Sequence, residues 1–252
     1  MPKYKEYEVY RMKDKGEKFY TNKGLLPDIP FKICIIGKSQ ISGKTNLAGG
    51  LICLDHFFNK DFEGDDIYIV SPSANNYSKL KNIIKFKEIP KQNVLLDFNE
   101  GEIDAICDYI KENYDEAIEE GDKPVNTLIF FDDTTFGGKM KENTYGVIAK
   151  IFCNMRHYNC SVIMNSQVYN DLPTTCRRNA SALMVFNISD KDLDIVNDEH
   201  NYLENKKDMK TLFRKNVKKK HSFFVINYSN DFDKMYQNDK FVPITLKENK
   251  ED

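Results

Sequence analysis

The sequence predicts an α/β domain in which a mostly parallel sheet lies between two layers of helices. Short apolar runs recur at residues 31–36, 66–70, 125–131, 161–164 and 182–186, and stretches with helical spacing separate them. Continuous apolar runs of this length are typical of parallel strands that are buried on both faces. A polar loop that ends in Gly-Lys-Thr follows the first run, as expected where a strand leads into a helix.

Composition limits the classes of protein that the chain can belong to. Its 252 residues are enough for one large domain with a substantial core. The net charge of −2 excludes a globally basic protein, so any nucleic-acid contact must come from local patches. The six cysteines form no C-x-x-C pair, which predicts reduced thiols in an intracellular protein and no zinc site. No apolar run approaches the ~18 residues of a membrane span, so we expect no membrane partner.

The first half of the chain is expected to begin with a polar N-terminal arm, residues 1–24. Proline-rich residues 26–30 then precede the first strand. A helix is predicted over 44–60, where leucines and phenylalanines fall on one side. A second helix is predicted over 102–120, because its apolar residues have helical spacing and its other face is acidic.

The second half continues the same alternation. Helices are predicted at 143–158 and 190–201, on either side of two short strands. Apolar residues at 222–226 and 241–244 predict a late β-hairpin. We therefore expect one domain over residues 25–246 and a charged tail over 247–252.

The most informative motif is the loop after the first strand, which has the layout of a nucleotide phosphate-binding loop. Backbone N–H groups and the following helix N-terminus can hold phosphate. Lys44 is expected to reach the β- and γ-phosphates, and the Thr45 hydroxyl to hold Mg²⁺. The candidate nucleotide-binding residues are Gly37, Lys38, Ser39, Gln40, Ile41, Ser42, Gly43, Lys44 and Thr45.

The spacing of this loop is irregular. Five residues separate Gly37 from Gly43 where four are usual, and Lys38 occupies the position of the first glycine. The longer loop either weakens phosphate binding or bulges away from the phosphate.

Two carboxylates follow the buried strand at 125–131. Ligands bind beyond the carboxyl ends of parallel strands, so Asp132 and Asp133 fall at the edge where the phosphate loop is expected. Asp132 is predicted to hold the metal ion, directly or through water. Asp133 is predicted to orient or deprotonate the attacking water. An ordinary acidic turn is the alternative if this pair is taken without the loop.

The next strand, at 161–164, also ends in polar residues. Gln167 or Asn165 could contact the γ-phosphate or the attacking water. Simple turn chemistry is an equal alternative from the residues alone, because Asn and Ser favour turns.

Arginines flank this strand. Arg156 precedes it, and Arg177 and Arg178 follow it. A guanidinium offered to a neighbouring subunit's γ-phosphate would stabilise transition-state charge. Arg156 is our first candidate and Arg177 or Arg178 the second, although most surface arginines have no such role.

One segment near the C-terminus is densely basic, with eight bases and one acid between residues 206 and 220. Such a cluster can neutralise DNA phosphates, but it can equally be a solvated lysine-rich helix. The candidate DNA-binding residues are Lys206, Lys207, Lys210, Arg214, Lys215, Lys218, Lys219 and Lys220.

The motif order extends into one specific run: Arg156-His157, Ser166-Gln167, Leu172-Pro173, then Arg177-Arg178-Asn179-Ala180. This order resembles the poxvirus-type DNA-packaging ATPases of large DNA viruses and virophages, a branch of the FtsK/HerA superfamily. The resemblance covers about residues 30–230.

The resemblance implies a RecA/ASCE-like P-loop NTPase fold and an ATP-driven translocase that packages double-stranded DNA into a preformed capsid. ATP and Mg²⁺ are the implied cofactors, and capsid or portal proteins the implied partners. It also implies a homo-oligomeric ring, in which an arginine completes the neighbouring site. Asp132 takes the Mg²⁺ position, Asp133 the catalytic carboxylate position and Gln167 the sensor position.

The implied location is the host-cell cytoplasm or a viral factory, with association with the virion as an alternative. Three other functions stay open. An FtsK/HerA-type helicase or translocase in plasmid transfer or repair would share the same site. A nucleotide-binding scaffold without hydrolysis is supported by the irregular loop alone. A small-molecule kinase is disfavoured by the paired carboxylates and the Ser-Gln strand end.

Overall fold

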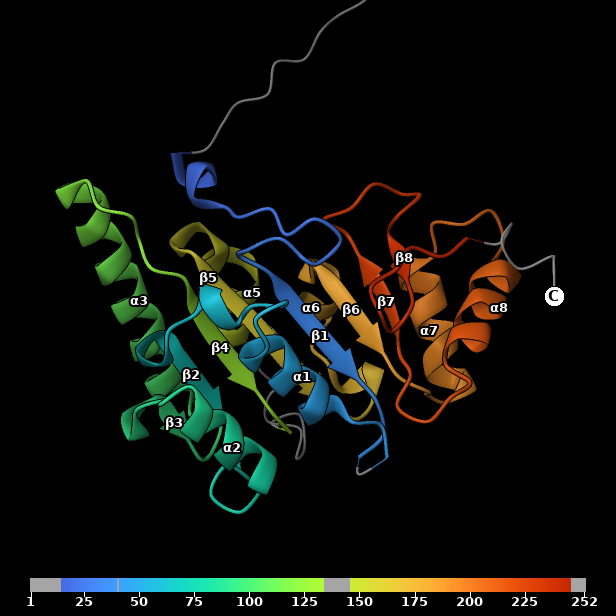
Figure 1. Cartoon of the computed structure of the whole chain (residues 1–252), viewed down its shortest axis with the longest axis horizontal. Coiled ribbons are helices and arrows are strands. Elements are labelled where there is room, and N and C mark those ends of the chain that lie inside the picture. The colour runs from blue at the N-terminus through green and yellow to red at the C-terminus, as the bar shows by residue number, and fades with distance from the viewer. Residues whose placement is uncertain (1–14, 40, 134–145, 246–252) are drawn as a thin grey trace, which may run out of the picture.

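The computed structural model describes residues 15–39, 41–133 and 146–245, and within them it contains one eight-stranded sheet (Figure 1). The strand order is β3-β2-β4-β5-β1-β6-β7-β8. All pairs from β3 to β6 are parallel, and β7 is antiparallel to both of its neighbours. The strands are β1 Lys32–Ile36, β2 Ile67–Val70, β3 Val94–Leu95, β4 Thr127–Phe131, β5 Cys160–Ser166, β6 Ala182–Val185, β7 Phe224–Asn227 and β8 Tyr236–Gln237.

Helices cover both faces of this sheet (Figure 1). Two of them, α1 and α2, pack on one face, and the remaining helices pack on the other. This arrangement confirms the predicted three-layer α/β class. The helices, with the labels of Figure 1, are α1 Lys44–Cys53, α2 Ser78–Phe86, α3 Glu100–Glu120, α5 Val147–Asn154, α6 Thr174–Asn179, α7 Asp190–His200 and α8 Lys206–Asn216.

The strand sequences explain the two cores. Successive side chains point to opposite faces of a sheet. In β1, Ile33 and Ile35 therefore belong to the core under α1 and α2, whereas Cys34 and Ile36 belong to the core under the other helices. All four side chains are fully buried. This two-sided burial is why the parallel strands are apolar throughout instead of alternating with polar residues.

The strand order determines where the polar strand ends meet. β5 lies between β1 and β4, with Ile35 opposite Asn165 and Phe131 opposite Met164. The loop after β1, the polar end of β5 and the residues after β4 therefore share one edge of the sheet.

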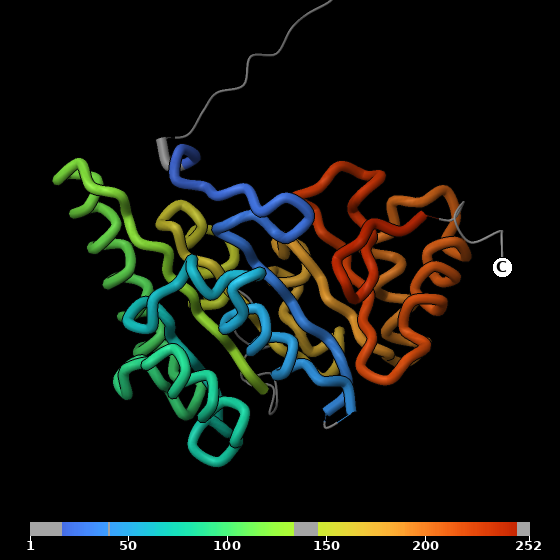
Figure 2. Tube along the Cα trace, viewed as in Figure 1, coloured from blue at the N-terminus to red at the C-terminus, as the bar shows by residue number. Residues whose placement is uncertain are grey.

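The segment before β1 is tied to the C-terminal half of the chain. Figure 2 shows this segment beside the turn that follows β7. The Leu25 carbonyl accepts hydrogen bonds from Asn227 at 3.0 Å and from Gln237 at 2.8 Å, and the Asp28 N–H donates to the Ser229 hydroxyl at 3.2 Å. These contacts connect the beginning of the domain to its last strands.

Several predicted boundaries are corrected by the structure. The helix predicted over 44–60 ends at Cys53, because Leu54 is already extended. The hairpin partner of β7 is β8; residues 241–244 contribute only an isolated bridge between Gln237 and Pro243. The helix predicted over 143–158 is α5 followed by a 3-10 turn, Met155–Tyr158, and its first residues lie outside the described ranges.

Some elements were absent from the prediction. α2 and the two-residue strand β3 both lie between β2 and α3. Leu80, Ile83 and Ile84 of α2 do have helical spacing, which the prediction overlooked, whereas the two residues of β3 are too few to show a pattern. Of the predicted arm, the described part holds a 3-10 turn, Lys15–Phe19, and a bridge between Thr21 and Ile29. The predicted tail over 247–252 lies outside the described residues.

Candidate functional site

The phosphate-loop candidate leaves β1 at the edge where the polar strand ends gather. The Gly37 N–H donates to the Ser166 carbonyl at 3.1 Å, which ties the loop to β5. A Cβ atom at Gly37 would lie 2.7 Å from the Ser42 Cβ and 2.8 Å from the Phe186 Cβ, so only glycine fits there. Gly43 has a φ of 99° and begins α1 in a left-handed conformation that glycine adopts without strain.

The extra residue of this loop is accommodated by a bulge. The Ser42 hydroxyl donates to the Lys38 carbonyl at 2.7 Å and the Ser42 N–H to the same oxygen at 3.3 Å, which closes a turn. Ile41, inside that turn, is 62% exposed. Gln40 lies outside the described residues. The geometry favours the second of the two expectations for the long loop, because Ile41 is exposed while Gly37 and Lys44, on either side of it, stay in contact.

Lys44 is buried beneath this loop. Its ammonium group donates to the Gly37 carbonyl at 2.7 Å. Burial lowers the pKa of Lys44, while the charges of Asp133 and Asp132 oppose that shift. A buried ammonium that bonds a neutral carbonyl oxygen is a strong site for an incoming anion.

Asp132 is the most constrained carboxylate of the site. Its side chain is fully buried, and it accepts hydrogen bonds from the Asn165 amide at 2.5 Å and from the Thr45 hydroxyl at 3.3 Å. Burial raises the pKa of Asp132 to about 6, and the two hydrogen bonds oppose that rise. Asn165, one of two sensor candidates, thus contacts the carboxylate that we expect to hold the metal.

The donor set fits Mg²⁺. This ion prefers oxygen ligands and is usually bound through one or two carboxylates together with substrate phosphates. The Thr45 hydroxyl and the Asp132 carboxylate lie side by side at the phosphate loop. Over the described ranges, no group of three or more His, Cys, Asp or Glu residues is arranged to hold a metal ion.

Asp133 has a different environment from Asp132. Its φ of 55° is left-handed, which is unusual for a residue other than glycine and typically costs about 1–3 kcal/mol. This conformation brings its side chain to the wall of the cavity at the phosphate loop, and Gln167 donates to it at 3.4 Å. The predicted pair of Asp133 and Gln167 is therefore brought together.

The cavity has a volume of about 320 Å³. The loop and the start of α1 form one wall. The sequence analysis missed two other contributors, the segment after β2 and a histidine from the turn before β7. Strand β2 was predicted to end at this edge, so its following segment could have been found. His221 left no signal in the sequence. The missed residues are Ser73, Asn76, Tyr77, Lys79 and His221.

The structure separates the three arginine candidates. Arg156 is exposed on the 3-10 turn before β5, at the edge of the sheet opposite to the phosphate loop. Arg178 is exposed near the end of α6. Arg177 is only 9% exposed and forms an ion pair with Glu199 at 2.7 Å. Among the described residues, no hydrogen bond or ion pair joins any of the three arginines to the phosphate loop.

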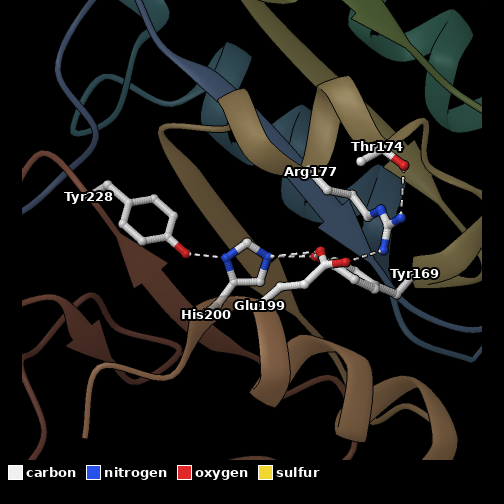
Figure 3. A network of polar contacts seen from close by, with 6 residues as sticks. All are labelled: Tyr169, Thr174, Arg177, Glu199, His200 and Tyr228. Atoms are coloured by element: carbon white, nitrogen blue, oxygen red, sulfur yellow. Dashed lines mark hydrogen bonds and ion pairs between the residues drawn. The ribbon is translucent and has the colours of Figure 1, made fainter. Parts of the chain in front are cut away.

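Arg177 belongs to a polar network beneath the sheet (Figure 3). Its guanidinium also donates to Thr174 and lies over the Tyr169 ring at 5.2 Å. The Tyr169 hydroxyl donates to Glu199 at 2.7 Å and lies 2.5 Å from His200. The network connects the turn after β5 with α6 and α7, so Arg177 is engaged inside its own subunit.

His200 lies between two tyrosines in this network. Burial lowers the pKa of His200 to about 4; the Glu199 charge opposes this shift and the Arg177 charge adds to it. Since Tyr169 donates its only hydrogen to Glu199, it accepts from the Nε2–H of His200. The Nδ1 atom then accepts from the Tyr228 hydroxyl at 2.5 Å. A neutral imidazole satisfies both contacts.

The basic segment divides into two parts. On α8, three bases face three acids of α7: Lys206 pairs with Asp198 at 2.5 Å, Lys210 with Asp194, and Arg214 with Asp190. These exposed ion pairs neutralise part of the positive charge that the sequence analysis proposed for DNA binding. Lys207 and Lys215 are exposed on the same helix. Lys218, Lys219 and Lys220 lie in the turn before β7, beside the phosphate loop.

Comparisons with known proteins identify relatives of this fold. The family model described as Poxvirus A32 protein matches residues 17–240. The DNA-packaging ATPase B204 from Sulfolobus turreted icosahedral virus has a TM-score of 0.52 and 16% identity, covering 80% of this chain and 94% of its own. The genome-packaging NTPase B204 from Sulfolobus turreted icosahedral virus 2, in complex with ATP-gammaS, has a TM-score of 0.52 and 16% identity. The match covers 79% of this chain and 93% of that protein. None of the curated proteins compared matches the chain.

Replacing Asp132 by Asn is expected to stabilise the nucleotide-free protein. A carboxyl whose pKa rises from 3.8 to about 6 on folding favours folding below pH 3.8, and this contribution is lost as pH rises through 6. The uncharged amide avoids that loss, and Asp132→Asn should raise the free energy of unfolding at pH 7 by about 3 kcal/mol. Urea denaturation without nucleotide or Mg²⁺ measures it. Asp115→Asn, at an exposed site on α3, should change little, and a less stable Asp132→Asn would contradict the electrostatic account.

The lowered pKa of His200 predicts that the free energy of unfolding depends on pH with the opposite sign. Its pKa is lowered on folding from 6.5 to about 4, so its contribution is complete above pH 6.5 and is lost as pH falls through 4. The loss should amount to about 3 kcal/mol. Denaturation curves of the unmodified protein and of His200→Gln between pH 7 and pH 4 would show it. The variant should have the shallower dependence, whereas parallel pH profiles would exclude a buried neutral histidine.

Proposed function

Because the chain belongs to the Poxvirus A32 protein family, we propose that it is an ATP-driven translocase that packages double-stranded DNA into a preformed viral capsid. One observation supports this most directly. A buried lysine, a hydroxyl–carboxylate pair and a second, cavity-facing carboxylate surround one phosphate loop. These are the groups that phosphoryl transfer to water requires.

ATP and Mg²⁺ are the proposed cofactors. In the nucleotide complex, Lys44 leaves the Gly37 carbonyl and contacts the β- and γ-phosphates. Thr45 and Asp132 would hold Mg²⁺, which supplies charge neutralisation at the phosphates. Asp133 orients or deprotonates the attacking water. Gln167 contacts Asp133 and is therefore placed to respond to the γ-phosphate.

The proposed assembly is a homo-oligomeric ring in which an arginine from one subunit completes the site of the next. Since Arg177 is held by Glu199 and Thr174, the exposed Arg156 and Arg178 are the two candidates for this role. Capsid or portal proteins are the proposed partners, and the infected host cell or the virion is the proposed location. No helix among the described residues is long and apolar enough to cross a membrane.

A scaffold that binds nucleotide without hydrolysing it has less support. Its basis in the sequence was the long loop, and the bulge at Ile41 leaves Lys44 and Thr45 beside the carboxylates. A helicase or translocase of plasmid transfer or repair would use the same site, so DNA packaging in the presence of capsids is the discriminating observation.

Hydrolysis is expected to depend on Lys44 and Asp133 in different ways. Lys44→Ala should abolish nucleotide binding and turnover. Asp133→Asn should keep binding but lower turnover at least about 100-fold, which is typical for loss of a general base. Steady-state ATP hydrolysis with and without double-stranded DNA measures both. Equal turnover in Asp133→Asn and the unmodified protein would remove Asp133 from the chemistry.

Mixing two inactive variants tests whether an arginine of one subunit completes the site of the next. Subunits with Arg156→Ala or Arg178→Ala retain an intact phosphate loop, and Lys44→Ala subunits retain the arginine. If the arginine acts on the neighbour, mixing Lys44→Ala protein with the relevant arginine variant should restore part of the activity that each lacks alone. If neither mixture recovers activity although both arginine variants are inactive, completion of a neighbouring site by these arginines is wrong.

A further inference from the structure

A second cavity, of about 250 Å³, lies beside the phosphate loop and shares Ser42 and His221 with the first. Lys38 and Ile41 contribute its loop side. The residues after β6, Phe186 and Asn187, form another side, and the turn between α8 and β7 completes it. None of the roles proposed so far uses this cavity.

The position of the cavity follows from the topology of the sheet. The chain leaves β1 into α1 on one face, and after β6 it enters α7 on the other face. Ligands bind where neighbouring parallel strands send their connections to opposite faces, because a crevice opens between them. The cavity lies at this crevice between β1 and β6.

The direction of the nucleotide follows from the catalytic groups. Asp132, Asp133 and Gln167 come from β4 and β5, on one side of β1. A triphosphate with its terminal phosphate beside Asp133 runs along the loop, so its nucleoside must leave on the other side of β1. That side is formed by β6 and the turn before β7.

This turn is an ordered structure. The Ser222 hydroxyl donates to the Lys219 carbonyl at 2.7 Å, and the Ser222 N–H to the same oxygen at 3.1 Å. His221 has a left-handed φ of 66°, and its Nδ1 lies 3.1 Å from the Ser42 carbonyl. These contacts hold the turn against the phosphate loop.

The lining has the character of a nucleoside pocket. Phe186 and Val217 are nearly buried and contribute apolar surface, whereas Asn187 is exposed at the end of β6. Apolar walls with a few polar groups are typical of small-molecule sites. An Asn amide both donates and accepts, which matches the paired donor and acceptor on an adenine edge.

We propose that this cavity binds the ribose and base of the nucleotide whose phosphates lie on the loop. Asn187 contacts the base, and Lys218, Lys219 and Lys220 contact the ribose and the adjacent phosphate. The three lysines thus serve the nucleotide and not the DNA. The inference rests on the proposed ATPase function, because it assigns a binding site to the nucleoside of the same ATP molecule.

Comparing ATP with inorganic tripolyphosphate tests the assignment, because tripolyphosphate lacks the nucleoside. Titration calorimetry with Mg²⁺ should show that Asn187→Ala weakens ATP binding about tenfold, as for the loss of one or two hydrogen bonds. Its affinity for tripolyphosphate should stay within about twofold. An equal loss for both ligands, or no loss for ATP, would overturn the nucleoside pocket. Binding of neither ligand by the unmodified protein would overturn the proposed function itself.

The lysines are tested separately. The triple variant Lys218→Ala, Lys219→Ala, Lys220→Ala should bind ATP more weakly and keep its affinity for double-stranded DNA. A matched triple replacement of exposed lysines elsewhere, at Lys81, Lys91 and Lys123, should change neither. Loss of DNA binding with unchanged ATP binding would overturn the assignment of the lysines to the nucleotide and support their role in gripping DNA.

Discussion

The candidate site depends on a single buried carboxylate, Asp132. A charged group without solvent is costly unless other groups bond to it. Asn165 from β5 and Thr45 from α1 supply those bonds. β4, which precedes Asp132, and β1, which precedes the phosphate loop, are not neighbours, because β5 lies between them in the sheet. The register of β5 therefore aligns the carboxylate with the phosphate loop, and burial still raises the pKa of Asp132 to about 6.

The two adjacent carboxylates differ because their backbones differ. Asp132 continues the direction of β4 and is buried, whereas the left-handed Asp133 lines the cavity. In the proposed mechanism the first carboxylate holds the metal and the second faces the water. The loop insertion does not disturb this division, since Ile41 bulges outward and Lys44 stays beneath the loop.

The sequence predicted the parts of the site that depend on strand ends. Apolar runs identified the buried strands, and polar residues directly after them had to meet at one edge. Asp132, Asp133 and Gln167 were proposed in this way, and the structure places all three at that edge. Asn165 was recognised as polar at the right edge, but its partner depends on strand order, which no local pattern encodes. His221, which contacts the loop, and Asn187, which lines the cavity beside it, were not identified because each lies on a segment distant from the loop in the sequence.

Charge patterns were the least informative feature of the sequence. The basic segment looked uniform, yet α8 pairs three of its bases with α7, while the following turn packs beside the phosphate loop. Arg177 was equally ambiguous, because its acidic partner Glu199 lies on another helix and only the tertiary fold brings the two together. Side-chain partners across elements decide such roles.

The central claim is that Asp132 and Thr45 form one metal-binding unit at the phosphate loop. A crystal structure with Mg²⁺ and a non-hydrolysable ATP analogue tests it most directly. We expect Mg²⁺ about 2.1 Å from the Thr45 hydroxyl oxygen. We also expect Asp132 to bind the ion directly or through one water, with Asn165 still donating to its carboxylate. A metal ion bound away from Thr45, or an Asp132 side chain turned away from the phosphates, would contradict the account.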